Sequence, residues 1–267
     1  MAPVIGLSSA SVYPESTAHA FGHAAQLGYD AVEVMVGIDA LSQQTSAIKQ
    51  LIDHHEMPVC AIHSPCLLWT QRVWGTEPWG KLERSAEMAA EVGAEVVVVH
   101  PPFRWQKEYA AGFVDGIAAL EESTGIDFAV ENMYPWRASA RRGTRMGMEM
   151  YLPGWDPSEE SYANATIDLS HAAIAQSDVV EMAVRMGSRL RHVHLTDGSG
   201  SAKDEHLVPG RGVMHASDFL AHVAATGFGG DVVIEINTRK ATNREQREAD
   251  LRESLEFARA HFVVPTR

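Results

Sequence analysis

Cysteine is scarce in this sequence: Cys60 and Cys66 are the only two among 267 residues. Two thiols cannot form the disulfide framework of a small secreted protein, so we expect the reducing environment of the cytoplasm. The amino terminus has no basic segment followed by an apolar run, and we see no signal peptide. The longest apolar runs, such as Val96–Val99, are too short to cross a bilayer. We therefore expect a cytoplasmic protein with no membrane partner.

Basic residues are also few, because 22 Lys and Arg stand against 35 Asp and Glu, for a formal net charge of −13. A surface that binds nucleic acid usually appears as a basic excess. The charge balance therefore disfavours a nucleic-acid partner. It does not exclude one, since bound cations and basic loops can reverse the sign of the potential in a cleft.

Short apolar runs alternate with amphipathic stretches along the whole chain. Such runs are typical of parallel strands that are buried on both faces. Eight of them with helices between predict an α/β fold, a single-domain (β/α)8 TIM barrel over residues 1–267. The alternative, a doubly wound open sheet, lacks a glycine-rich phosphate-binding motif after the first strand. The expected strands are Val4–Ser8, Ala31–Val36, Val59–His63, Glu95–His100, Phe128–Asn132, Thr166–Leu169, Arg191–Leu195 and Val232–Asn237.

The amphipathic stretches between the strands predict helices, most of which end just before a glycine, a common helix stop. Two connections, at about 64–80 and 133–164, are long, and long loops in a compact domain are usually functional or disordered. Both would lie at the carboxyl-terminal face, where TIM-barrel enzymes place their active sites. The expected helices are Thr17–Leu27, Ser42–His55, Lys81–Val92, Tyr109–Ser123, Ser177–Met186, Ala216–Thr226 and Gln246–His261.

Polar side chains lie at the ends of most expected strands, which would converge at one mouth of the barrel. Carboxylates and imidazoles that converge repel or desolvate one another unless a cation joins them. Oxygen and nitrogen ligands without a thiolate suit a divalent metal such as Mg, Mn, Co, Fe or Zn. The residues concerned are Glu33, His63, His100, Glu131, Asn132, Asp168, His171, His192, His194, Asp197, Glu235 and Asn237.

The carboxylates in apolar strands are the strongest candidates, since a buried carboxylate is costly to leave unpaired. They are Glu131, Asp168 and Glu235. A strand-end histidine is more often simply hydrogen-bonded than a ligand. Glu33 is well explained by pairing with a neighbouring base. We expect His192 and His194 to lie on opposite faces of their strand, and we choose His194, nearer the strand's end, as the ligand.

Seven short motifs occur in a characteristic order, and their order and spacing are specific although each alone is weak. They resemble, over essentially the whole chain, the xylose isomerase-like barrel superfamily and its sugar phosphate isomerase/epimerase group. The motifs are HSP at His63–Pro65, VVHPP at Val98–Pro102, VENM at Val130–Met133, IDLSH at Ile167–His171, HVHLTD at His192–Asp197, DEHLVPGRG at Asp204–Gly212 and VIEIN at Val233–Asn237.

This resemblance implies one divalent ion bound by Glu131, Asp168, His194 and Glu235. It also implies that Glu131 and Glu235 are catalytic and exchange the proton on the carbon next to a carbonyl, while His171 contacts a substrate hydroxyl. The expected activity is metal-dependent isomerisation or epimerisation of a small sugar, polyol or sugar phosphate. A related dehydratase would begin with the same proton abstraction.

The chain also resembles the family two AP endonucleases of the same superfamily, which bind three zinc ions. This second resemblance implies a zinc-dependent phosphoesterase with up to three zinc ions. If one ion is bound, His63, His100 and His171 would instead contact substrate. A third hypothesis, an inactive barrel that only binds a ligand, is disfavoured by the cost of unused buried carboxylates. The residues that match the zinc ligands are His63, His100, Glu131, Asp168, His171, His194, Asp204, His206 and Glu235.

Tryptophan and basic residues are concentrated in the expected mouth loops. Arginine can hold a phosphate or carboxylate with two hydrogen bonds, and tryptophan can stack on a sugar or an aromatic ring. We take Arg137, Arg211 and Trp105 as candidate substrate contacts. Solvated charge and loop packing explain these residues equally well, and the tryptophans are also compatible with a homo-oligomer interface. The residues concerned are Trp69, Trp74, Trp79, Trp105, Trp136, Trp155, Arg72, Arg104, Lys107, Arg137, Arg141, Arg142, Arg145, Lys203, Arg211, Arg239 and Lys240.

Overall fold

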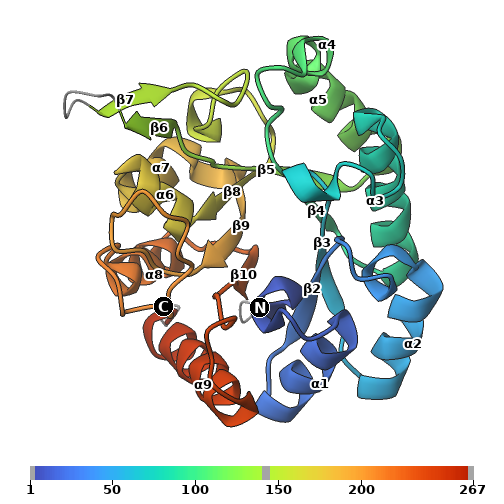
Figure 1. Cartoon of the computed structure of the whole chain (residues 1–267), viewed down its shortest axis with the longest axis vertical. Coiled ribbons are helices and arrows are strands. Elements are labelled where there is room, and N and C mark those ends of the chain that lie inside the picture. Colours follow the sequence, from blue (N-terminus) through green and yellow to red (C-terminus); the bar gives the residue numbers. More distant parts are fainter. Residues whose placement is uncertain (1–3, 140–144, 264–267) are drawn as a thin grey trace.

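Eight parallel strands close into a barrel in the computed structural model, which describes residues 4–139 and 145–263 (Figure 1). Their order around the barrel is β1–β10–β9–β8–β5–β4–β3–β2. The predicted TIM barrel is therefore confirmed. The strands are β1 (Val4–Ser8), β2 (Ala31–Met35), β3 (Val59–His63), β4 (Val96–Val99), β5 (Asp127–Glu131), β8 (Ala165–Asp168), β9 (Leu190–Leu195) and β10 (Asp231–Ile234).

The helices surround the barrel (Figure 1). Gly28, Gly93 and Gly125 cap three of them with φ of 86°, 80° and 70°, a left-handed conformation that glycine adopts without a Cβ clash. None of the helices in the described ranges has the length and apolar character needed to cross a membrane. The helices are α1 (Thr17–Leu27), α2 (Thr45–His55), α3 (Pro78–Val92), α4 (Lys107–Ala111), α5 (Phe113–Thr124), α6 (Leu169–Ala175), α7 (Val179–Met186), α8 (Ala216–Ala225) and α9 (Arg244–His261), with short 3-10 turns at Ser9–Val12, Leu41–Gln43, Leu68–Thr70, Pro157–Glu159 and Gly187–Arg189.

The interior of the barrel is polar at the mouth, where the carboxyl ends of the strands lie, and apolar further inside. Alternate residues of a strand share a face, so Ala61 and His63 of β3 point the same way, as do Ala129 and Glu131 of β5. Ala61 and Ala129 belong to a buried apolar cluster with Val96 and Val98 of β4. The larger core lies between the strands and the helices, and Phe21, Phe113, Phe128 and Phe219 are among its fully buried side chains. Because side chains alternate along each strand, His63 and Glu131 point into the barrel at its mouth, next to the apolar cluster of Ala61, Val96, Val98 and Ala129.

Three local features differ from the sequence predictions. The helix expected at Tyr109–Ser123 is divided at Gly112 into α4 and α5. Helix α6 was not expected, because it starts directly at the end of β8. Asp168 is its N-cap and accepts a hydrogen bond from the backbone N of His171 at 2.7 Å. Strand β10 ends at Ile234, so Glu235 lies just beyond it, with its backbone N bonded to Leu195 O at 3.3 Å.

The long connection between β5 and β8 contains an antiparallel hairpin of β6 (Trp136–Ser139) and β7 (Arg145–Met148). The hairpin projects from one side of the barrel (Figure 1). Arg141 and Arg142 lie outside the described residues. Arg137 lies on β6, but its side chain also falls outside what the structure describes, so its expected substrate contact remains a prediction.

Candidate metal centre

Four polar side chains from neighbouring strands meet at the mouth of the barrel. Glu131 ends β5, Asp168 ends β8, His194 lies on β9 and Glu235 follows β10. The register pairs Asp168 with His194 across β8 and β9. One potential ligand atom from each of the four lies within 4.8 Å of the others. None of the four residues is more than 7% exposed. The structure thus brings together all four residues of the expected metal site.

The arrangement of these four residues fits a divalent cation. His194 Nδ1 lies 2.9 Å from Glu235 Oε2, 3.2 Å from Glu131 Oε1 and 3.8 Å from Asp168 Oδ2. Asp168 Oδ2 is buried and has no hydrogen-bond partner. Three buried carboxylates that point at one another are unfavourable without positive charge between them. A set of oxygen ligands with one imidazole nitrogen suits several divalent ions.

The histidines and carboxylates shift one another's protonation. Burial alone would raise the pKa of Glu131, but His194 and His100 outweigh it and hold this pKa well below its usual range. Burial would lower the pKa of His194, yet Glu235, Glu33 and Glu131 raise it well above its usual range. Burial raises the pKa of Asp168. Without a cation the cluster therefore holds protons, and a metal would have to displace them.

Glu33 of β2 forms a second layer beneath His194. Its Oε2 lies 3.1 Å from His194 Nε2 and 2.9 Å from His192 Nε2, and all three side chains are fully buried. The prediction that His192 and His194 face opposite ways is wrong. Residues two apart on a strand share a face, and both of these contact Glu33. Glu33 is paired with neighbouring bases, His192 and His194, as the sequence suggested.

A second group of potential ligands adjoins the first through Glu131. His100 Nε2 and His63 Nε2 lie 2.9 and 3.3 Å from Glu131 Oε2. Cys66 completes this group, since one atom from each of His63, Cys66 and His100 lies within 4.8 Å of the others. Burial raises the pKa of the Cys66 thiol, but His100 and His63 outweigh it and lower this pKa well below its usual range. Sequence reasoning missed Cys66, although its position three residues after His63 was a signal.

A third group lies on the side of Asp168. His171 Nε2 is 3.3 Å from Asp204 Oδ2, and His206 Nε2 is 3.0 Å from Asp204 Oδ1. One potential ligand atom from each of Asp168, His171 and His206 lies within 4.8 Å of the others. All the residues that match the zinc ligands of the AP endonucleases therefore belong to one continuous cluster around Glu131 and Asp168.

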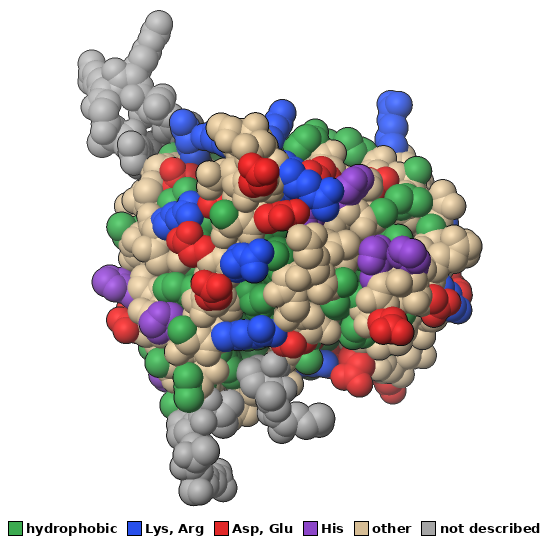
Figure 2. Space-filling view, turned by 90° about the horizontal axis from the view of Figure 1, so that it is seen from below, with side chains coloured by type: hydrophobic (Ala, Val, Ile, Leu, Met, Phe, Trp, Pro, Cys, Tyr) green, Lys and Arg blue, Asp and Glu red, His purple; other side chains and the backbone are tan. Residues whose placement is uncertain are grey.

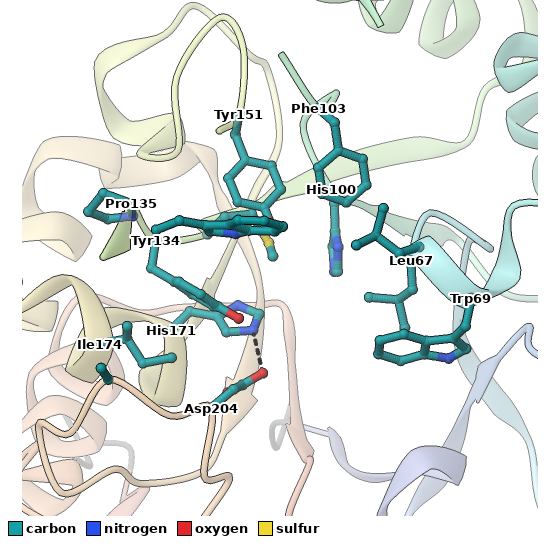
Figure 3. Close-up of a pocket in the computed structure, with 14 residues that line it drawn as sticks. Leu67, Trp69, His100, Phe103, Tyr134, Pro135, Tyr151, His171, Ile174 and Asp204 are labelled. Carbon is teal, nitrogen blue, oxygen red and sulfur yellow. Dashed lines mark ion pairs between the residues drawn. The ribbon is translucent and has the colours of Figure 1, made fainter. Parts of the chain in front are cut away.

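A pocket of about 420 Å³ opens above this cluster, and His100, His171 and Asp204 line it. In Figure 3 Tyr134, Ile174 and Asp204 lie on one side of the pocket, and Leu67 and Trp69 lie across from them. These walls come from the segments after β3, β5 and β9 and from α6. The carboxyl-terminal loops thus build the pocket over the cluster, as the barrel fold predicts.

Trp105 and Arg211, two of the expected substrate contacts, lie in different surroundings. Trp105 lines an adjoining pocket and stacks on Phe103, with ring centres 4.5 Å apart. Arg211 does not line either pocket. Its Nη2 lies 2.9 Å from Asp250 Oδ1, and its Nε lies 3.0 Å from Glu253 Oε1, both on α9. Arg211 was expected to contact substrate, and this placement corrects that prediction, because α9 already supplies the carboxylates that neutralise its charge.

Two tryptophans pack into the structure instead of facing the mouth. Trp79 was expected in a loop but lies in the first turn of α3, against Tyr109 and Phe113 at 4.8 and 6.3 Å between ring centres. Trp74 packs against the core, and its Nε1 donates to Gln43 O at 3.2 Å. The expectation that all the tryptophans lie in mouth loops is therefore wrong for Trp79.

Comparisons with known proteins agree with this architecture. An uncharacterized protein of Mycobacterium tuberculosis is 46% identical over 273 residues, covering 97% of this chain and 98% of its own. Fructoselysine 3-epimerase of Escherichia coli is 21% identical over 241 residues, covering 82% and 85%. A solved D-tagatose 3-epimerase-like protein matches with a TM-score of 0.67 at 24% identity, covering 97% of this chain and all of that one.

A solved family two AP endonuclease of Brucella melitensis matches with a TM-score of 0.67 at 17% identity, covering 93% of this chain and 96% of that one. These likenesses at low identity show a shared fold. A family model described as the xylose isomerase-like TIM barrel matches residues 21–261. The chain therefore belongs to the family of xylose isomerase-like TIM barrels.

Proposed function

We propose that this protein is a metal-dependent isomerase or epimerase of a small sugar or polyol, which moves a proton on the carbon next to a carbonyl. The observation that carries the proposal is the convergence of Glu131 and Glu235 on one buried site, where each places an oxygen within 3.2 Å of His194 Nδ1. The similarity to fructoselysine 3-epimerase and to a D-tagatose 3-epimerase-like protein supports it.

Glu131, Asp168, His194 and Glu235 would hold the metal. A divalent ion bound there supplies a positive charge that polarises the carbonyl of the substrate and stabilises the negative charge left when the neighbouring C–H loses its proton. Asp168 is suited to this purpose because its free Oδ2 is buried and its Oδ1 is fixed by the backbone N of His171.

Glu131 and Glu235 would move the proton. The pKa of each carboxyl is lowered, because neighbouring histidines outweigh the effect of burial, so both are ionised near neutral pH and can accept a proton. They come from opposite ends of the row β5, β8, β9 and β10, so they approach a bound substrate from different directions. Two such bases could remove a proton from one face of a carbon and return it to the other.

His171 and Asp204 would position the substrate. Both line the pocket next to the cluster, and their side chains are held together by the ion pair drawn in Figure 3. The ring Nδ1 of His171 lies 2.9 Å from the backbone O of Asn132, which fixes the plane of the ring. These groups offer a donor and an acceptor to the hydroxyls of a sugar.

Solvent deuterium exchange tests the proposal. Metal-loaded protein is incubated in D₂O with a panel of ketoses, and proton NMR follows the signal of the C–H next to the carbonyl. We expect loss of that signal with at least one ketose and no loss with Glu235→Gln. Glu245→Gln, in the first turn of α9, is the matched control. Exchange that survives in Glu235→Gln, or no exchange with any ketose, would contradict the proposal.

A second candidate function is hydrolysis of a phosphate ester with more than one zinc ion. The three adjoining groups of potential ligands favour it, since metals held a short distance apart can activate water and bind both displaced oxygens. The face of the molecule seen in Figure 2 gives it no support. On the face seen in Figure 2, Lys and Arg side chains are interspersed with Asp and Glu and form no broad basic area. The number of metal ions per chain distinguishes the two functions.

A further inference from the structure

The pocket over the metal centre has two chemically different parts. Its polar side chains, His100, His171 and Asp204, belong to the cluster of potential ligands at the base. The remaining wall is mostly apolar and aromatic. It includes Leu67, Trp69, Phe103, Tyr134, Trp136 and Ile174. A small sugar bearing hydroxyls on every carbon would leave some of them facing this wall without partners, at a free-energy cost for each.

The described lining also offers no cation to a phosphate. Neither Lys nor Arg is among the described side chains that line this pocket. Lys81 lines the adjoining pocket, but its Nζ donates to Thr70 O at 3.1 Å and to Gln71 O at 2.8 Å. Phosphate is usually held by Arg or Lys with charge-assisted hydrogen bonds. The described wall therefore suits an uncharged group better than a phosphate.

Two indoles of this wall are open to solvent although they lie beside a pocket. The exposed fraction is 69% for Trp69 and 37% for Trp136. Trp136 lies edge-on to Trp105, with ring centres 6.5 Å apart, and Trp105 is stacked on Phe103 with an angle of 4° between the planes. Exposed aromatic surface around a concave site is typical of a place that a ligand covers, and indoles pack best on flat apolar groups.

We propose that the substrate is a sugar that carries a planar apolar substituent, as in an aryl glycoside. The sugar lies at the polar base and the substituent lies against Trp69 and Trp136. A pocket of about 420 Å³ is within the range of about 300–1,000 Å³ that holds ligands of this size. The assignment of the sugar portion rests on the proposed function, whereas the assignment of the substituent rests on the pocket wall alone.

Calorimetric titration of the metal-loaded protein with three probes tests this proposal. The probes are phenyl β-D-glucopyranoside, methyl β-D-glucopyranoside and glucose 6-phosphate, which share the sugar and differ in the attached group. We expect the phenyl glycoside to bind at least about tenfold more tightly than either of the others, from the stacking and burial of its ring. Equal binding of the phenyl and methyl glycosides, tighter binding of the phosphate, or no binding of any probe would overturn the proposal.

Single substitutions test whether Trp69 and Trp136 cause the tighter binding of the phenyl glycoside. Trp69→Ala and Trp136→Ala should each weaken the phenyl glycoside by about two- to tenfold and leave the methyl glycoside within about twofold, since only the stacking is lost. Val184→Ala on α7, whose side chain is 62% exposed, is the control and should change neither. Circular dichroism checks that the variants fold. A phenyl preference unchanged in both tryptophan variants would contradict the assignment of the wall.

The binding experiment and the proton-exchange experiment can give opposite results, so the substituent site and the proposed function are tested separately. A phenyl preference in a protein that exchanges no C–H proton would support the substituent site and contradict the isomerase. Proton exchange with simple ketoses, without any phenyl preference, would support the isomerase and overturn the substituent site. Glu235→Gln should retain the preference, because Glu235 does not line the apolar wall.

Discussion

His194 Nε2 lies 3.1 Å from Glu33 Oε2, while His194 Nδ1 faces the carboxylates of Glu131 and Glu235. A neutral imidazole that keeps its hydrogen on Nε2 can donate it to Glu33 and direct the lone pair of Nδ1 toward the metal position. A carboxylate behind a ligand histidine fixes both the ring and its tautomer. We therefore propose that Glu33 is a positioning residue for His194.

Replacing Glu33 should weaken metal binding. Loss of a carboxylate behind a ligand histidine typically costs about 10–100-fold in metal affinity, and we expect this for Glu33→Ala. Glu33→Gln retains an oxygen that can accept from Nε2, so its loss should be smaller. Calorimetric titration with Mn²⁺ or Zn²⁺ measures both, with Glu245→Gln as control. Equal affinity in all the variants would show that Glu33 does not position His194.

The affinity for metal should rise with pH. In the metal-free protein burial would lower the pKa of His194, but the surrounding carboxylates raise it well above its usual range, so His194 carries an extra proton near neutral pH. That proton must leave before Nδ1 can bind a cation. Titrations in buffers of different ionisation enthalpy count the protons released. Release of none, with affinity independent of pH, would contradict the assignment of His194 as a ligand.

The stability of the metal-free protein should fall as pH rises above neutral. Burial lowers the pKa of His206, but Asp204 and Asp168 raise it to about 10 from the ordinary 6.5. Because the folded value lies above the unfolded one, this stabilisation is fully present below about pH 6.5 and is lost as pH rises through about 10. Thermal unfolding with a chelator at a series of pH values measures it.

His206→Gln should flatten that pH dependence, since it removes the titrating group. Glu205→Gln, next to it in sequence, is the control and should leave the slope above neutral pH unchanged. A melting temperature that stays constant or rises between about pH 7 and pH 10 in the wild-type protein would contradict the assignment.

Asp197 should stabilise the loop that carries Asp204 and His206. Its two carboxylate oxygens accept from the backbone N of Gly198, Gly210, Gly212 and Met214 at 2.9–3.1 Å. Hydrogen bonds to a charged group contribute about 1.5–3 kcal/mol each. We therefore expect Asp197→Ala to lower the free energy of unfolding by about 3 kcal/mol or more, as measured in urea. Asp197→Asn retains one acceptor oxygen and should lose less, whereas an unchanged midpoint for Asp197→Ala would refute this role.

Much of the barrel and of the candidate metal site follows from the sequence. Continuous apolar runs that end in Glu131, Asp168 or His194 require buried parallel strands, and closure of the barrel then brings their ends together. Glu235 was also identified, although it lies just beyond β10. The local periodicity of strands and helices was enough to predict that these residues meet. It identifies the strands, and closure of the barrel as a whole then fixes where the strand ends lie.

Other parts depend on contacts that a sequence does not display. No turn residues in the sequence indicate the start of helix α6, because Asp168 is both the last residue of β8 and the N-cap of the helix. Cys66 joins the histidines only through the fold of its loop, and Arg211 turns to α9 because Asp250 and Glu253 are there. The orientation of His192 could have been predicted, since alternation along a strand requires it to share the face of His194.

Elemental analysis of protein purified without chelator tests whether the mouth of the barrel holds a divalent metal. We expect about one Mn, Mg, Co or Fe per chain, bound by Glu131, Asp168, His194 and Glu235, and its loss in Asp168→Asn. Two to three zinc ions per chain would instead extend the ligand set to His63, His100, His171, Asp204 and His206 and favour ester hydrolysis. A protein that neither retains nor binds a divalent metal would contradict the metal centre itself.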